Sequence, residues 1–140
     1  MSKVKLKGGK AETLLAKALW HKGYRYRKND KKLPGSPDIV ILKHRIAVFI
    51  DGEFWHGKDW DTRSTHLKRN REYWIEKIQE NMARDLRNDQ LLTRLGWTPI
   101  HFWEKEVMKN LPACVAEIEG TILAHLIEGI DDFGPVDLEE

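Results

Sequence analysis

The chain has 140 residues, of which 41% are hydrophobic and 33% charged, which suits one compact domain with a real core. No apolar run approaches the roughly 18–20 residues that span a membrane, and the basic start lacks the apolar block of a secretory signal. The single cysteine, Cys114, excludes an internal disulfide and a multi-thiolate zinc site, and it favours a reducing, cytosolic location.

The net charge of +2 hides a strong asymmetry along the chain. Residues 1–35 contain eleven Lys and Arg against two acids, whereas residues 111–140 contain eight acids and no Lys or Arg. A basic surface releases counterions when it neutralises phosphates, so the N-terminal third predicts contact with a polyanion. From charge alone, a solvated basic face is the alternative. The acidic end is expected to pack away from such a ligand.

The predicted elements alternate between helix and strand. An apolar stripe of Leu14, Leu15, Ala18 and Leu19 predicts the first helix, and Gly23 ends it. In chain order we expect a helix at 9–22, a strand at 24–28, a turn at 32–37, strands at 38–42 and 46–50, a loop at 57–68, a helix at 69–95, a strand at 97–103 and a helix at 111–128.

These elements predict an α/β fold in which helices cover a short mixed sheet. The two central strands are almost continuously apolar, so we expect both of their faces to be buried. No internal repeat is present, which favours a single domain over residues 1–140, with a basic arm at about 1–9 and an acidic tail at about 131–140.

Two acids stand at the ends of these central strands. Asp38 begins the first strand and Asp51 ends the second. If the strands form an antiparallel hairpin around residues 43–45, the two carboxylates meet at one edge of the sheet. Adjacent carboxylates repel unless a cation lies between them, and hard oxygen ligands suit Mg²⁺. The alternative is that both acids cap strand ends in solvent.

The residues after Asp51 resemble a metal-dependent nuclease motif with one change. Glu53 lies two positions further on, but Trp55 stands where such motifs carry lysine. His56 follows, and a neutral imidazole beside a metal is suited to take the proton from an attacking water. The alternative for His56 is a packing or hydrogen-bonding role.

Helical spacing makes two further acids, Asp85 and Glu12, candidate site residues. Trp74, Ile78, Asn81 and Asp85 share one face of the long helix. A carboxylate on a core-facing stripe is costly unless it is paired or functional, and Glu12 raises the same question on the first helix. For each acid alone, a salt bridge to a nearby Lys or Arg is the simpler interpretation.

The chain also has six tryptophans. Trp20, Trp97 and Trp103 lie in regular elements and are expected in the core. Phe54 and Trp55 lie just beyond a strand, where apolar side chains can unstack a base step or simply close the core.

Several blocks of this sequence, taken in order, resemble the very short patch repair (Vsr) endonucleases. The match covers about residues 10–106. The blocks are Leu33-Pro-Gly-Ser-Pro-Asp38-Ile-Val, Val48-Phe-Ile-Asp-Gly-Glu-Phe-Trp-His56, Tyr73-Trp-Ile-Glu-Lys-Ile-Gln-Glu-Asn81-Met-Ala-Arg-Asp85, Leu95-Gly-Trp97 and Phe102-Trp-Glu104.

This resemblance implies a restriction-endonuclease-like, three-layer α/β/α fold and Mg²⁺-dependent nicking of DNA beside a T:G mismatch. It implies that Asp38 is the principal metal ligand, with the main-chain carbonyl of Ile50, and that His56 is the general base. It also implies Glu12 and Asp85 as supporting acids, and Phe54, Trp55 and Trp74 as aromatics that insert beside the mismatch. Asp51, where the mismatch enzymes can carry His, is a further catalytic and metal candidate because of its place at the strand end.

Two features depart from the resemblance. Family members hold a structural zinc largely by cysteines, whereas Glu53 and Lys105 stand at two of those positions here. We therefore expect no zinc site and suggest an ion pair between these two residues. The N-terminal arm that grips DNA is reduced to its lysines, which are Lys3, Lys5, Lys7 and Lys10.

The sequence thus predicts a Mg²⁺-dependent DNA endonuclease, with Mn²⁺ as a substitute cation, that nicks double-stranded DNA in repair of T:G mismatches. We expect a bacterial, cytoplasmic monomer that works with repair or restriction proteins. The alternatives are a nuclease of a mobile element or restriction system with another DNA substrate, a non-catalytic DNA-binding module, and a structural or protein-interaction domain.

Overall fold

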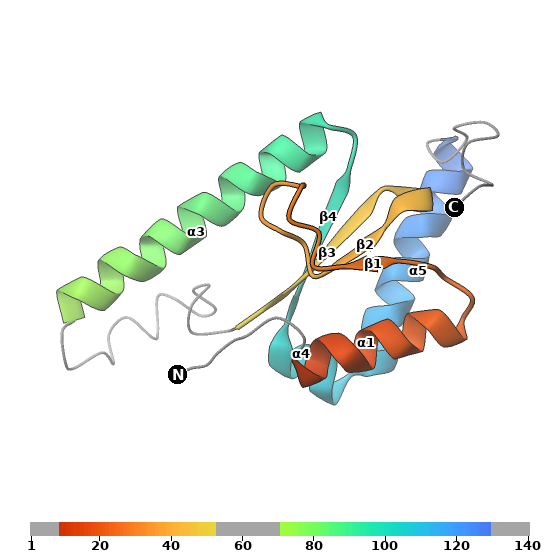
Figure 1. The fold of residues 1–140 in the computed structure, drawn as a ribbon, viewed down its shortest axis with the longest axis horizontal. Helices are drawn as coiled ribbons and strands as arrows, with labels where there is room; N and C mark the ends of the chain where they lie inside the picture. Colours follow the sequence, from red (N-terminus) through yellow and green to blue (C-terminus); the bar gives the residue numbers. More distant parts are fainter. Residues whose placement is uncertain (1–8, 53–70, 130–140) are drawn as a thin grey trace.

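The computed structural model describes residues 9–52 and 71–129, which fold around one four-stranded sheet (Figure 1). The strands lie in the order β1-β2-β3-β4. The pairs β1–β2 and β2–β3 are antiparallel, and β3–β4 is parallel, so the sheet is mixed. The strand bounds are β1 Arg27–Lys28, β2 Ile39–Ile41, β3 Ile46–Asp51 and β4 Thr98–Trp103.

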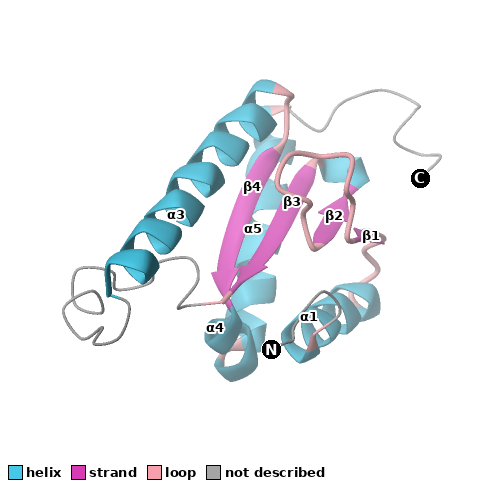
Figure 2. Cartoon of the chain, turned by 60° about the vertical axis from the view of Figure 1, so that its left-hand side comes forward, coloured by secondary structure: helices cyan, strands magenta, loops and turns pink. Residues whose placement is uncertain are grey.

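Helices cover both faces of this sheet (Figures 1 and 2). On one face, α1, α4 and α5 pack against the larger core, and on the other face α3 packs against a smaller one. This is the three-layer α/β/α arrangement that the sequence predicts. The helix bounds are α1 Lys10–His21, α3 Arg71–Arg94, α4 Glu104–Lys109 and α5 Leu111–Glu128.

The expected hairpin is confirmed. Ile39 pairs with Val48 and Ile41 with Ile46 in antiparallel register. The connection is a 3-10 turn over Leu42–His44, and Arg45 adopts a left-handed conformation (φ 53°) that reverses the chain.

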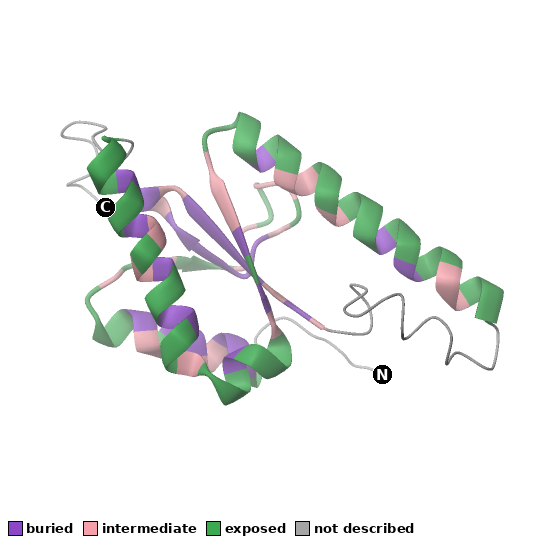
Figure 3. Cartoon of the chain, turned by 180° about the vertical axis from the view of Figure 1, so that it is seen from behind, coloured by how far each residue is buried: buried purple, intermediate pink, exposed green. Residues whose placement is uncertain are grey.

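Strand alternation divides β3 between the two cores. Ile46 and Val48 face α1 and α5, whereas Ala47 and Phe49 face α3 and pack with Leu92. Burial on both faces, expected from the apolar sequence, is therefore confirmed (Figure 3). Each such aliphatic side chain contributes about 1.5–3 kcal/mol by leaving water.

The long helix α3 presents a narrow stripe to the sheet. Ile78, Asn81 and Leu92 are buried, and the rest of the helix is partly or fully exposed (Figure 3). Gly96, with a positive φ of 90°, follows its last turn as expected. The closing helix α5 has the predicted bounds, and none of the helices in the described ranges is long and apolar enough to cross a membrane.

Three local expectations are corrected. Trp20 is not in the core but 49% exposed, because it lies beside the buried stripe of α1. Its ring packs instead under the Arg25 guanidinium at 3.6 Å and edge-on to Tyr26. The first strand is only two residues long, since the pairing with β2 begins at Arg27. The short helix α4 between β4 and α5 was not expected.

Gly35 and Gly120 provide a matched test of the turn that precedes Asp38. Gly35 has a φ of +81°, and an added Cβ would lie 3.0 Å from the Phe49 ring, whereas a Cβ at exposed Gly120 in α5 meets nothing. We expect Gly35→Ala to lower the free energy of unfolding by about 1–3 kcal/mol. Gly120→Ala should raise it by about 0.5–1 kcal/mol. Urea titrations followed by circular dichroism measure both, and an unchanged midpoint for Gly35→Ala would contradict the strain.

Candidate active site

Asp38 is anchored where β2 begins. Its N–H donates to the Val48 carbonyl (2.9 Å), its own carbonyl accepts from the Asn29 N–H (2.9 Å), and its Oδ2 accepts from the Ile50 N–H (2.8 Å). The residue is 9% exposed. The backbone and the carboxylate are both held, so the Asp38 side chain has a defined position at the end of the hairpin.

The Ile50 carbonyl lies on the Asp38 side of β3. Residues two apart in a strand direct their main-chain groups to the same neighbour. Val48 accepts from Asp38 and the Ile50 N–H donates to its carboxylate, so the Ile50 carbonyl faces the same side, beyond the last residue of β2 that could pair with it. A carboxylate and a main-chain carbonyl therefore lie on the same side of β3 at the end of the hairpin.

Asp51 ends β3 on the face covered by α3. Its Oδ2 lies 2.7 Å from His101 Nδ1, and His101 Nε2 lies 2.8 Å from both carboxylate oxygens of Asp89. The His101 ring also stacks on Phe49, with centroids 4.6 Å apart and planes 9° from parallel. His101 therefore joins β3, β4 and α3 through one ring.

The charge state of His101 follows from these contacts. Burial of the ring lowers its pKa, but hydrogen bonds to Asp51 and Asp89 and the charges of the two acids outweigh this effect and raise the pKa to about 9. Since a neutral imidazole has only one N–H to donate, two carboxylate partners require the doubly protonated ring. At neutral pH His101 is a cation between two anions.

Glu12 lies on α1 and is 4% exposed. Lys28 Nζ is 3.4 Å from its Oε2, and the Asn29 side-chain amide donates to the same oxygen at 3.5 Å. The salt bridge that we considered for this acid is therefore present. Asn29 also pairs with Asp38 through the main chain, so it connects Glu12 to the strand that carries the principal candidate ligand.

Trp74, Asn81 and Asp85 lie on the less exposed face of the long helix, as the spacing predicts. Asn81 is buried, while Trp74 and Asp85 are partly exposed. Trp74 meets Tyr73 edge-on at 5.0 Å. All three lie on the helix whose later turns carry Asp89.

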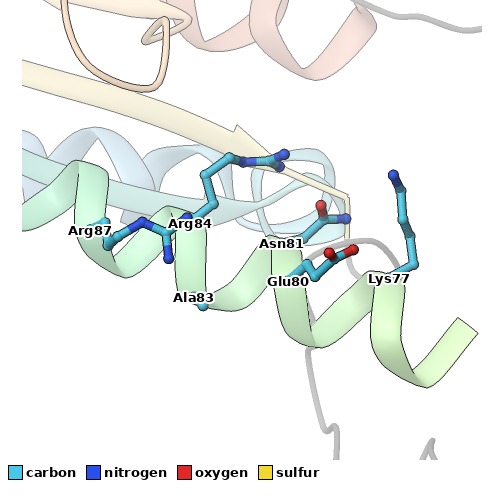
Figure 4. Close-up of a pocket in the computed structure, with 6 residues that line it drawn as sticks. All are labelled: Lys77, Glu80, Asn81, Ala83, Arg84 and Arg87. Carbon is cyan, nitrogen blue, oxygen red and sulfur yellow. The ribbon is translucent and has the colours of Figure 1, made fainter.

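An open depression of about 470 Å³ lies along α3 beside this face. Figure 4 shows Lys77, Asn81 and Arg84 extending from one side of the helix, with Arg87 a turn further on. The depression is lined by Lys77, Glu80, Asn81, Ala83, Arg84 and Arg87. Three cations against one acid make this side of α3 basic.

Several predicted site residues lie outside the described ranges, and the expected loop at 57–68 lies there too. Lys10 is described and is the exposed first residue of α1. Lys105 is in α4, but its suggested partner is not described. The predicted residues outside the described ranges are Lys3, Lys5, Lys7, Glu53, Phe54, Trp55 and His56.

Sequence reasoning missed Asn29, Asp89 and His101. One signal was available for His101, because it is the polar residue in the apolar run of a strand, between Ile100 and Phe102. Asp89 follows Asp85 by one helical turn. Asn29 carried no signal, since Asn before Asp in a turn-rich segment is ordinary.

The oxygen ligands at this edge suit a hydrated Mg²⁺. Mg²⁺ usually keeps several waters and binds through one or two carboxylates together with substrate phosphates. Within residues 9–52 and 71–129, no three His, Cys, Asp or Glu side chains are grouped to hold a metal.

Asn29 Oδ1 supports the same conclusion. It is buried without a hydrogen-bond donor among the described residues, at a cost of about 1–3 kcal/mol if no water reaches it. Exchanging the amide O and N would place the oxygen against the Glu12 carboxylate, which is worse. A water of a hydrated cation could donate to this oxygen.

Sequence comparison shows that the relatives of this chain are endonucleases. The family described as DNA mismatch endonuclease Vsr matches residues 1–62, a range that includes Glu12, Asp38 and Asp51. The type II nicking enzyme V.HpaIIP of Haemophilus parainfluenzae is 50% identical over 123 residues, which are 88% of this chain and 87% of that protein. The chain belongs to the Vsr family of endonucleases.

Two further relatives show the breadth of the family. The type II nicking enzyme V.NmeDIP of Neisseria meningitidis serogroup C is 45% identical over 122 residues, covering 87% of this chain and 82% of the relative. The DNA mismatch endonuclease Vsr of Escherichia coli K12 is 38% identical over 93 residues, covering 66% of this chain and 59% of the relative. The class of this protein is thus a nuclease that acts on DNA.

The raised pKa of His101 predicts a pH-dependent contribution to stability. The contribution is fully present below the ordinary pKa of 6.5 and is lost as the pH rises through about 9. We expect the difference in unfolding free energy between wild type and His101→Leu to shrink over this interval. Urea titrations of the metal-free proteins at a series of pH values measure it, and a difference independent of pH would contradict the double ion pair.

Proposed function

We propose that this chain is a Mg²⁺-dependent endonuclease that nicks one strand of duplex DNA beside a T:G mismatch by hydrolysing a phosphodiester. The observation that carries the proposal is the Asp38 carboxylate, held against the main chain of Ile50 at the end of the hairpin, in a chain of the Vsr family. Asp51 ends the neighbouring strand, one residue beyond Ile50.

Asp38, the Ile50 carbonyl and Asp51 would hold the cation. When bound, Mg²⁺ polarises the scissile phosphate and makes a bound water more acidic. Mn²⁺ has similar ligand preferences and would substitute. His56 would accept the proton from the attacking water.

Glu12 and Asp85 would position waters around this centre. Glu12 is suited to the role because Lys28 and Asn29 keep its carboxylate in place. Asn29 Oδ1 would accept a hydrogen bond from one such water. Asp85 lies on α3, the helix that covers the face of the sheet to which Asp51 belongs.

Basic residues on two elements would hold the duplex. Lys10 begins α1, and the lysines before it, which are Lys3, Lys5 and Lys7, continue the basic arm. Lys77, Arg84 and Arg87 make one side of α3 basic. Contacts of this kind position the backbone without reading sequence, and Phe54, Trp55 and Trp74 would insert beside the mismatch. In this proposal the protein acts on DNA in the cytoplasm as a monomer.

A second candidate function has specific support. The relatives from Haemophilus and Neisseria are named type II nicking enzymes, and their matches span more of the chain than that of the mismatch endonuclease. A nuclease associated with a restriction system, acting on its own DNA substrate and with partner proteins of that system, is therefore the alternative to general mismatch repair. A non-catalytic DNA-binding module is disfavoured, because binding alone does not require a fixed acid at Asp38.

Asp38→Asn tests the metal centre with little change in shape. The amide oxygen can still accept from Ile50, but the charge that binds a cation is lost. We expect nicking to fall at least about 100-fold, and His56→Ala to fall similarly, as for removal of a catalytic acid or base. DNA binding in a gel-shift assay should stay near wild type.

Glu117→Gln, an exposed change on α5, is the control for that comparison and should nick normally. Wild-type rates in both Asp38→Asn and His56→Ala would refute the assignment.

The substrate is tested with end-labelled duplexes that differ only in one T:G pair. We expect the wild-type protein to nick one strand of the mismatched duplex with Mg²⁺ or Mn²⁺ and to leave it intact with EDTA. Equal nicking of the matched duplex would favour the restriction-system alternative over mismatch repair. Cleavage in EDTA would contradict the metal centre.

A further inference from the structure

The ring of His101 is fixed by more contacts than a histidine at the surface usually makes. His101 is opposite Phe49 in the parallel register of β3 and β4, and the two rings stack with their planes 9° from parallel. The stack fixes the plane of the imidazole. The two carboxylates, one at each nitrogen, then fix its rotation within that plane.

Asp51 gains a defined orientation from this arrangement. His101 Nδ1 donates to Asp51 Oδ2 at 2.7 Å, a short, charge-assisted bond. Asp38 donates its N–H to the Val48 carbonyl, and its carboxylate accepts from the N–H of Ile50, the residue before Asp51. Contact of Asp51 with the His101 cation also offsets the repulsion between the Asp51 and Asp38 carboxylates at one edge of the sheet.

Asp89 gives the same ring a second role. It lies on α3, twelve residues from His101 in the chain, and accepts from Nε2. The helix and the sheet are therefore joined at the level of the candidate centre. The two nitrogens of one ring thus separate two tasks, since Nδ1 binds Asp51 at the end of β3 and Nε2 binds Asp89 on the helix.

We propose that His101 is a positioning residue that holds the Asp51 carboxylate at the metal-binding edge, in addition to joining α3 to the sheet. This inference rests on the proposed function, since it gives Asp51 a place beside a cation. His101 touches neither the cation nor DNA in this role. It acts through Asp51 in the way that outer-shell partners orient metal ligands.

The side-chain amides of Asn and Gln separate the two tasks of the ring. The amide of His101→Asn reaches about as far as Nδ1 and can still donate to Asp51. The amide of His101→Gln reaches about as far as Nε2 and can still donate to Asp89. Both variants lose the cation and the ring stack, so each serves as the other's control for general destabilisation.

Mn²⁺ binding to the full chain without DNA, followed by electron paramagnetic resonance, measures the positioning directly. We expect His101→Gln to weaken Mn²⁺ binding about 10-fold or more, the usual effect of losing an outer-shell partner, and His101→Asn to remain closer to wild type. Urea midpoints should fall similarly in both. In an Asp51→Asn background, the same two changes should have no further effect on Mn²⁺ affinity.

The outcomes separate this inference from the function on which it rests. Suppose that wild type binds Mn²⁺ and nicks DNA, and that His101→Asn and His101→Gln have the same Mn²⁺ affinity as each other. His101 then only joins the helix to the sheet, and the inference is overturned. An effect that persists in the Asp51→Asn background also overturns it. If wild type binds no Mn²⁺ and nicks no duplex with any divalent cation, the proposed function fails and the inference with it.

Discussion

The antiparallel pairing of β2 with β3 is the constraint on which the candidate site depends. Ile39 opposite Val48 sets the register, and the preceding residue, Asp38, bonds to the Val48 carbonyl and to the Ile50 N–H at the end of that pairing. A slip of one residue would turn the apolar side chains of β2 to the other face and move the carboxylate away from the Ile50 carbonyl. The positions of the Asp38 carboxylate and the Ile50 main chain are therefore fixed by a hairpin that is buried on both faces.

The two cores on either side of this hairpin have different consequences for the site. The face of α1, α4 and α5 carries most of the buried apolar side chains and holds Glu12 within it. The face of α3 has a smaller apolar core, and polar contacts of His101 with Asp51 and Asp89 add to it. Burial alone fixes the first face. The second depends in part on charges, which are sensitive to pH and salt.

Most of the fold was predictable from local patterns, because each element carries its own signal. Apolar periodicity marked the helices, continuous β-branched runs marked the central strands, and the glycines after α1 and α3 marked the helix ends. The errors arose where a signal was absent. Two residues are too few to show the alternation of β1. No local signal marks that Trp20 lies beside the buried stripe of α1 and packs under Arg25 rather than in the core.

By itself, the sequence determined the family, the sheet and the acids at the hairpin, since Asp38 and Asp51 stand at fixed distances from apolar runs. Only the tertiary structure revealed the partners of those acids. Asp51 and His101 are separated by 50 residues in the chain, and Glu12 and Asn29 by 17. No local pattern encodes such contacts, because they depend on which strand lies beside β3 and which helix crosses it. The identity of the acids is local chemistry, whereas their orientation and their partners are properties of the folded chain.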